Sequence, residues 1–406
     1  MKISQILRNS FAALILGTLF SSCSNDVDVI GEWKEIPVVY AVFSPYPDSS
    51  GINYFRIEKA FLDPDTDALL IAQRPDSIYY GPNDLEVTIY ERTVFTNYTV
   101  LDTLERVDFS TLGITRDSGI FARTPNYVYM MNNQVRLGSD DDQFYKLVIK
   151  NLVNGKVYTQ YSRGITMGVF SPSDLTYTNF KFTLPTQSRP IRWSHVDPAS
   201  NETVFDKVDF NWSQPSNAAI YDLTVILRYA EFQADLNTTG EPEIPGTRVY
   251  KEVSWKAIRN FAAPGDMRLT TPFQNSEKFY YFVKNDGGSV KQELNGENFY
   301  NFLASNLSDV VTSGSNIRRC AIKIDARIDA GGPEIAEYIR ARNANQNLLG
   351  GLFPADPFSN IEEGYGIFSY KFHIYRRNYN IEDETFDYLN SGEITRNLGF
   401  KSFGCN

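Results

Sequence analysis

The sequence predicts a mainly β protein made of two antiparallel β-sandwich domains, with a few helices inserted in or packed beside the second. Three observations support this class. Runs of β-branched and aromatic residues recur along the 406-residue chain, separated by turns rich in Pro, Gly, Asn and Asp. Several runs alternate apolar and polar residues, which is typical of half-buried strands. Helical periodicity occurs only late in the chain.

The N-terminal residues 1–22 have the order of an export signal, and we expect them to be removed. Lys2 and Arg8 give a positive start, Phe11–Phe20 is apolar, and two serines precede Cys23. The apolar stretch is about half as long as a bilayer-spanning helix. A cysteine directly after such a stretch resembles a lipoprotein signal, which implies acylation of Cys23, for example by palmitate. The alternative is an ordinary secretory signal with an incidental cysteine.

Residues 23–34 are interpreted as a short acidic tether, and residues 35–170 as the first sandwich. An Asn-Gly pair at 154–155 lies between two strand-like runs and predicts a hairpin with a type I′ turn, because both central residues of that turn need positive φ. The expected strands of this domain are 36–43, 54–61, 85–91, 144–150 and 156–161.

Residues 171–406 are assigned to the second sandwich, after a boundary region rich in proline. Val208–Trp212 and Tyr221–Tyr229 form a strand pair with an inward Trp212, a pattern that resembles fibronectin type III or immunoglobulin-like sandwiches. Helices are expected near 297–307, with apolar residues on one face, and near 333–347, which begins with proline. The further strands expected are 247–255, 267–272, 278–284, 320–329 and 366–376.

Catalytic signatures are scarce after the export signal. The chain has two histidines, His195 in a Pro-rich context and His373 in an alternating strand, and it contains no Gly-x-Ser-x-Gly elbow and no P-loop. We therefore expect both histidines to be structural, the protein not to be an enzyme, and no cofactor. Paired carboxylates from distant segments would leave no pattern in the sequence.

The acidic stretch Asp63, Asp65 and Asp67 is spaced like part of a calcium loop. The sixth position is Ala68 and the twelfth is Arg74, so the pattern does not fit an EF-hand. We expect a solvated acidic turn here, with a looser calcium site as the alternative.

Two cysteines remain besides the one predicted to carry lipid. Cys320 opens a strand-like run and Cys405 is the penultimate residue. An exported chain meets an oxidising compartment, so a disulfide between them would tie down the C-terminus. Two free thiols are the alternative, and the residues alone leave both open.

The charge balance limits the partners. The chain carries 39 Lys and Arg against 49 Asp and Glu, a net charge of −10, without a local basic cluster in the sequence. This argues against nucleic acid and anionic lipid headgroups as partners. Membrane attachment would depend on the acyl chains.

Three stretches resemble uncharacterised β-sandwich lipoproteins of the Bacteroidota outer membrane, which are often associated with TonB-dependent receptors. They are Ser24–Asp28, the Tyr-x-Leu-x-Ile-x-Asn hairpin at 145–158 and Asn360–Phe368. The resemblance implies an outer-membrane, lipid-anchored and surface-exposed protein, with Asp26 and Asp28 in its export signal.

Two function classes follow from the sequence. The first is a non-catalytic surface lipoprotein that docks on an outer-membrane β-barrel, such as a TonB-dependent transporter, or on an assembly or secretion machine. The alternative is a glycan- or ligand-binding lipoprotein for nutrient capture. The glycines of 360–368 are expected to serve the backbone, so this stretch adds no reaction.

Overall fold

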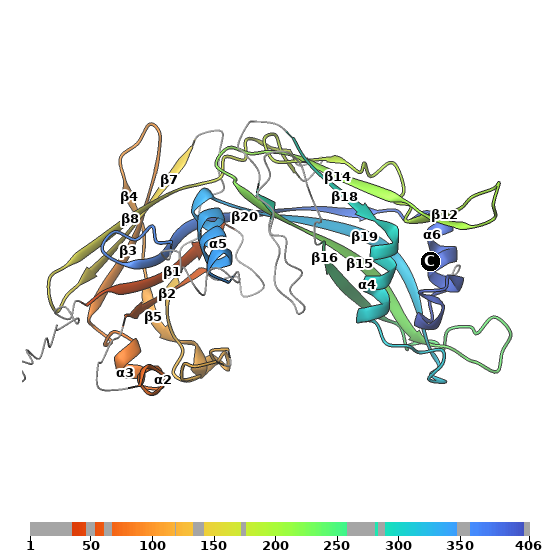
Figure 1. The fold of residues 1–406 in the computed structure, drawn as a ribbon, viewed down its shortest axis with the longest axis horizontal. Helices are drawn as coiled ribbons and strands as arrows, with labels where there is room; N and C mark the ends of the chain where they lie inside the picture. Colours follow the sequence, from red (N-terminus) through yellow and green to blue (C-terminus); the bar gives the residue numbers. More distant parts are fainter. Residues whose placement is uncertain are drawn as a thin grey trace, which may run out of the picture.

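The computed structural model describes residues 35–45, 53–60, 67–117, 119–132, 142–171, 176–257, 281–282, 289–346 and 358–401. The protein is mainly β, as the sequence predicts, and it is elongated (Figure 1). The predicted export signal and the acidic tether lie outside the described residues.

A long sheet runs through the molecule and holds it together. Its strands follow the order β16-β15-β19-β20-β1-β2-β6-β5, and β17 pairs with β15 beside this path. β1 and β20 are parallel, and the other pairs of this sheet are antiparallel. The strands are β1 Pro37–Phe43, β2 Asn53–Lys59, β5 Glu105–Asp108, β6 Tyr127–Met131, β15 Ile220–Gln233, β16 Val249–Lys256, β17 Tyr281–Phe282, β19 Ile317–Gly331 and β20 Tyr365–Tyr379.

Two smaller antiparallel sheets pack on this long sheet. The first has the order β4-β3-β7-β8 and the second the order β11-β14-β18. The strands of the first are β3 Leu85–Thr93, β4 Thr99–Thr103, β7 Gln143–Asn151 and β8 Val157–Arg163. Those of the second are β11 Phe182–Leu184, β14 Lys207–Ser213 and β18 Ser289–Asn295. Two further strand pairs are β9 Phe170–Ser171 with β10 Thr176–Tyr177, and β12 Ser194–Val196 with β13 Thr203–Phe205.

The expected helices are α4 Gly296–Asn306 and α5 Pro333–Gln346, which starts at the predicted proline. α4 buries Phe299 and Leu303 as its periodicity predicts. The structure also contains elements that the sequence does not predict: α2 Ala68–Ile71, α3 Pro75–Ile78, α6 Asp383–Ser391 and the 3₁₀ turns η1 Phe109–Leu112 and η2 Arg396–Leu398. α2 and α3 lie at one end of the molecule and α6 at the other, whereas α5 lies near the middle beside β20 (Figure 1).

The predicted hairpin is confirmed, but its predicted turn is wrong. β7 and β8 pair in register from Phe144 opposite Arg163 to Lys150 opposite Val157. Of the two turn residues only Gly155 has a positive φ, of 75°, whereas type I′ needs two. The Gly155 N–H instead donates to the Asn151 carbonyl at 2.9 Å, which closes a longer loop.

The parallel contact between β1 and β20 joins the two ends of the chain. Val39 lies opposite Gly366, whose φ of +114° and whose closeness to the Val39 carbonyl leave no room for a side chain. The expected backbone role of a glycine in the 360–368 stretch is confirmed here. The long sheet thus takes strands from both sides of the predicted boundary at residue 170, and the domain division itself stays a prediction.

The core continues under both small sheets. Under the first, Phe43 packs against Tyr145 at 4.8 Å and Phe368 at 5.2 Å between ring centres. Under the second, the fully buried Trp212 packs against Tyr221 at 5.6 Å, which confirms the predicted inward Trp. The predicted pairing of these two strands is wrong, because β14 and β15 lie in different sheets that face each other. Alternating strands therefore bury one face of each small sheet and leave the other to solvent.

Candidate functional site

The buried carboxylate of Glu58 connects strand β2 to the loop that carries Arg116. Glu58 lies on β2 with its side chain only 6 % exposed. Its Oε1 accepts from Arg116 Nη1 at 2.8 Å and from Arg56 Nη1 at 3.3 Å, and its Oε2 accepts from Arg116 Nη2 at 3.3 Å. One carboxylate thus holds two guanidinium groups, which leaves one excess positive charge in a partly buried position.

Asn126 and Asp108 fix the loop that carries Arg116. Arg56 Nη2 donates to Asn126 Oδ1 at 2.8 Å, and Asn126 Nδ2 donates to the Ile114 carbonyl at 3.0 Å. The backbone N–H of Asn126 donates to Asp108 Oδ1 at 2.9 Å, and Ser110 donates to the same oxygen. Desolvation works to raise the pKa of Asp108, but these hydrogen bonds outweigh it and lower the pKa.

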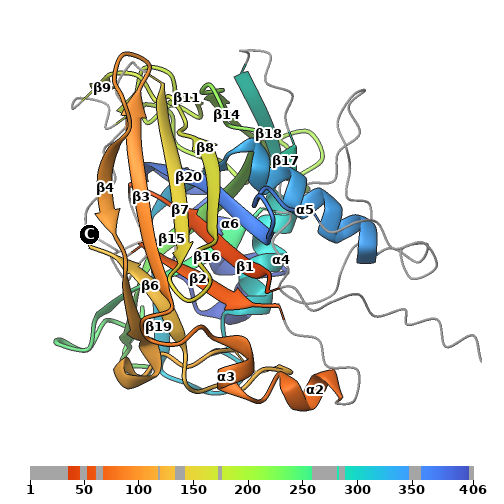
Figure 2. The same ribbon diagram turned by 90° about the vertical axis from the view of Figure 1, so that its left-hand side faces the viewer.

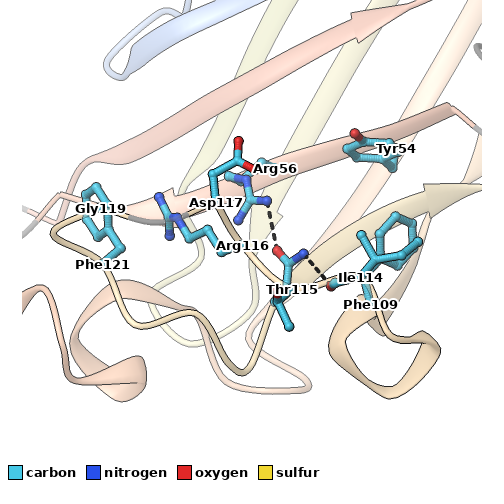
Figure 3. Close-up of a pocket in the computed structure, with 10 residues that line it drawn as sticks. Tyr54, Arg56, Phe109, Ile114, Thr115, Arg116, Asp117, Gly119 and Phe121 are labelled. Carbon is cyan, nitrogen blue, oxygen red and sulfur yellow. Dashed lines mark hydrogen bonds between the residues drawn. The ribbon is translucent and has the colours of Figure 1, made fainter. Parts of the chain in front are cut away.

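A hollow of about 400 Å³ opens beside these groups (Figure 3). Tyr54 and Phe109 form one side of it, with ring centres 5.2 Å apart. Phe121 forms another side, with the Arg116 guanidinium 3.9 Å from its ring centre. The hollow is therefore partly cationic and partly lined by aromatic rings.

Ile114 lines the hollow, and neighbouring segments carry further exposed aliphatic side chains; we call this set the apolar end. They are between 49 % and 64 % exposed, and they are Leu69, Leu70, Leu112, Ile114 and Ile120. Backbone contacts hold their segments together, since Ala122 donates to Ala72 at 3.2 Å and Arg116 donates to Arg123 at 3.0 Å. Figures 1 and 2 both place α2, α3 and the loop after η1 at this end.

The chemistry of this site favours contact over reaction. Its guanidinium groups are engaged by Glu58 and Asn126, so their hydrogen-bonding capacity is largely used within the fold. Exposed aliphatic side chains around a core of Arg, Tyr and Phe are typical of protein–protein interfaces. This arrangement supplies shape and apolar area for a partner.

Both histidines have neighbours that fit the structural role expected for them. His195 Nδ1 lies 3.0 Å from Asp206 Oδ2, an oxygen that also accepts from Arg192 Nε at 2.9 Å. The adjacent Ser194 hydroxyl lies on the other face of the strand and bonds the Tyr300 hydroxyl at 2.7 Å. His373 lies on β20 opposite Asp329, with Tyr375 close by.

Of the other candidate residues from the sequence, the structure describes only Asp67 and Cys320. Cys23, Asp26, Asp28, Asp63, Asp65 and Cys405 lie outside the described residues. Asp67 accepts from the Leu69 N–H at 2.8 Å and caps α2. Within the described segments no three His, Cys, Asp or Glu side chains gather as a metal site would need.

Cys320 is buried in β19 and takes part in a disulfide. The other cysteines of the chain, Cys23 and Cys405, lie outside the described residues, so the pairing with Cys405 stays a prediction. A nearby contact supports it. The N–H of Lys401, four residues before Cys405, donates at 2.9 Å to the carbonyl of Arg319, which directly precedes Cys320.

Comparison with known proteins adds no relative: no family model matches the chain, and no curated protein matches it. Across the part of the chain that the structure describes, no helix has both the length and the apolar character needed to cross a membrane.

Sequence reasoning did not identify Arg56, Arg116 or the apolar end. The contact of Arg116 with Glu58 joins residues far apart in the chain, and no local pattern marks it. A local signal for an exposed apolar site did exist: the pair Leu69-Leu70 follows an acidic stretch and lies in the short helix α2. Only the fold shows that both leucines stay exposed.

Proposed function

We propose that this chain is a lipid-anchored, non-catalytic protein of the bacterial outer surface that docks on an integral outer-membrane β-barrel. A TonB-dependent transporter, or an assembly or secretion machine, would be such a partner. The order of the N-terminal export signal and Cys23 supports the location. The resemblance to Bacteroidota surface lipoproteins supports the same assignment.

The observation that carries the docking proposal is the apolar end. Five large aliphatic side chains lie exposed on α2, on η1 and on the loop that lines the hollow. Leaving such a cluster in water is unfavourable by about 25 cal/mol for each Å² that a partner would cover. The cluster therefore favours a partner surface of matching apolar character, as contiguous exposed patches do in general.

The non-catalytic assignment has its own support in the described residues. The His195 ring is paired with Asp206, and the hydroxyl of the adjacent Ser194 is bonded to Tyr300. The two arginines of the hollow are held by Glu58. These groups are arranged as parts of the fold.

We extend the proposal to the architecture. Each small sheet, together with the part of the long sheet beneath it, would form one sandwich of the immunoglobulin or fibronectin III type. The contact of Phe43 with Tyr145 supports the first unit, and that of Trp212 with Tyr221 supports the second. The 15-residue strand β20 would belong to both units.

Anchoring is tested by Cys23→Ala, with cell fractionation and labelling by a palmitate analogue. The wild type should take label and sediment with the outer membrane, and the variant should lose both properties. Protease shaving of intact cells tests surface exposure, and Asp26→Ala with Asp28→Ala should reduce it. Outer-membrane sedimentation of an unlabelled wild type would contradict the lipid anchor.

Docking is tested by purifying the full-length chain from mild-detergent extracts and weighing the complex by native mass spectrometry. The wild type should carry one integral β-barrel protein in fixed stoichiometry. Leu70→Asp with Leu112→Asp should release it, because burying a charge in an apolar contact is costly. Val249→Asp, at an equally exposed position on β16, is the matched control and should keep the complex.

A further inference from the structure

The outer face of the β4-β3-β7-β8 sheet carries rings and cations in alternation. The register places Tyr90 opposite Lys146, and Lys146 opposite Tyr161. In the next row it places Arg92 opposite Phe144, and Phe144 opposite Arg163. We call this surface the ring–cation face; it consists of Tyr90, Arg92, Tyr98, Phe144, Lys146, Tyr161 and Arg163.

The rings position the cations at short range. The Arg92 guanidinium lies 4.3 Å from the ring centre of Phe144 and 5.2 Å from that of Tyr98. Lys146 Nζ lies 4.3 Å from the Tyr90 centre and 4.8 Å from the Tyr98 centre. Arg163 lies 5.4 Å from Phe144. A ring attracts a cation through its quadrupole and leaves the net charge in place.

Two of the three cations of this face, Arg92 and Lys146, keep their charge. Among the described residues Arg163 pairs with Asp142, whereas no carboxylate forms an ion pair with Arg92 or Lys146. The two cations lie on neighbouring strands, which are about 4.8 Å apart, so their positive fields add. In a chain with a net charge of −10, this concentration of positive charge is a local exception.

We propose that the ring–cation face binds an acidic polysaccharide whose sugar rings bear carboxylates. Planar carboxylates match the guanidinium fork of Arg92 and can approach Lys146 as a point charge. The C–H faces of sugar rings can pack on the half-exposed Tyr161 and on exposed aliphatic neighbours such as Val100.

The shape of the face selects a polymer of this kind. Arg92, Lys146 and the ring of Tyr161 lie on three successive strands, so one small anion cannot contact all three, whereas an extended chain can. The face presents side chains only. An acidic peptide that added a strand would need free backbone groups, which a sheet offers at its edges. This site shares no residue with the apolar end, so the docking proposal and this proposal can each fail without affecting the other.

The test measures binding of the full-length protein, in detergent, to immobilised polygalacturonate at low and moderate salt. Wild type should bind and should weaken as salt screens the charges. Arg92→Gln with Lys146→Gln should weaken binding about tenfold or more, since two charge contacts are lost. Lys207→Gln with Lys291→Gln, which removes the same charge from the outer face of the other small sheet, should leave binding unchanged.

A conservative variant separates charge from folding. Arg92→Lys with Lys146→Arg keeps both charges and should retain most of the binding, and circular dichroism should show all variants folded. The proposal is overturned by absent binding, by equal loss in the Lys207 and Lys291 variant, or by equal binding of neutral dextran. Tighter binding of dextran sulfate, polyglutamate or anionic vesicles would assign the face to another class of anion and would also contradict it.

Discussion

The two small sheets cover neighbouring parts of one long sheet, yet their outer faces hold cations in different ways. On the second, Lys207 Nζ lies 2.8 Å from Glu293 Oε1, and Lys291 Nζ lies 2.8 Å from Asp209 Oδ2. On the first, Lys146 and Arg92 lie against aromatic rings.

Cations on the outer face of an antiparallel sheet can be neutralised or can stay available to a partner, and the two small sheets show one case each. Cross-strand carboxylates neutralise the cations of the second sheet, so that face has little charge left for a partner. Rings order the cations of the first sheet and leave their charge available. The inner faces are alike, because both bury mainly apolar residues. A comparison of variants on the two sheets can therefore separate stability from binding.

The largest expected effects come from the inner faces, where the two regions should behave alike. Trp212→Ala in the second sheet should lower the free energy of unfolding by about 3–5 kcal/mol, and Leu147→Ala in the first by about 2–5 kcal/mol. Chemical denaturation measures both. Val100→Ala on the outer face, which should cost less than about 0.5 kcal/mol, is the control. Equal losses at all three positions would contradict the assignment of inner and outer faces.

The next largest loss of stability is expected at the parallel contact of β1 with β20, which connects the two regions. Gly366→Ala adds a Cβ that would lie 1.9 Å from the Val39 carbonyl oxygen, at a φ of +114°. Gly113→Ala is the control, because that glycine has a φ of +80° and open space around it. The control should cost about 1–2 kcal/mol from backbone strain alone. Gly366→Ala should cost clearly more in denaturation, and an equal cost would show that β1 and β20 can separate locally.

A smaller, pH-dependent effect is expected at Glu241, between β15 and β16, because its carboxylate binds two cations. Hydrogen bonds from Arg318 at 2.7 and 2.9 Å, and then from Lys401, lower the pKa of Glu241 from 4.5 to about 2. Its stabilisation is present above pH 4.5 and is lost as the pH falls through about 2. Melting temperatures between pH 6 and pH 2 should show this loss.

Glu241→Gln isolates the contribution of that one carboxyl. The variant should be less stable than wild type at pH 6, and the difference should shrink towards pH 2, where the wild-type carboxyl is protonated. A constant difference across the range would mean that this ion-pair cluster does not contribute through its charge.

The smallest effects sharpen the contrast between the outer faces. Lys146→Met removes two cation–ring contacts and should cost about 0.5–1 kcal/mol. Lys207→Met removes one exposed ion pair, and its smaller cost should disappear at high salt because the pair is screened. Denaturation at two salt concentrations measures both. The same salt dependence at both positions would contradict the contrast.

Much of the fold could be predicted from local patterns. Alternation identified β3, the Asn-Gly pair between two strand-like runs identified β7 and β8, helical periodicity identified α4, and a proline marked the start of α5. The type I′ turn was wrong because Asn154 keeps a negative φ once the loop closes through Asn151. The parallel pair of β1 and β20 joins residues more than three hundred positions apart, which no local pattern encodes.

The sites were harder to predict, for the same reason. The sequence has no basic cluster, because Arg92, Lys146 and Arg163 lie in different strands and meet only through the register of β3, β7 and β8. The apolar end likewise combines α2 with the loop after η1. The order of residues that ends at Cys23 predicts a location, and the Cys23→Ala experiment tests that prediction.

The most direct test of the central claim, docking through the apolar end, is site-specific photo-crosslinking in living cells. A photoreactive residue at Leu70 should give one major adduct with an integral outer-membrane β-barrel, identified by mass spectrometry. The same probe at Val249 should give little or none. Adducts of equal yield at both positions, or adducts with lipid alone at Leu70, would contradict the account.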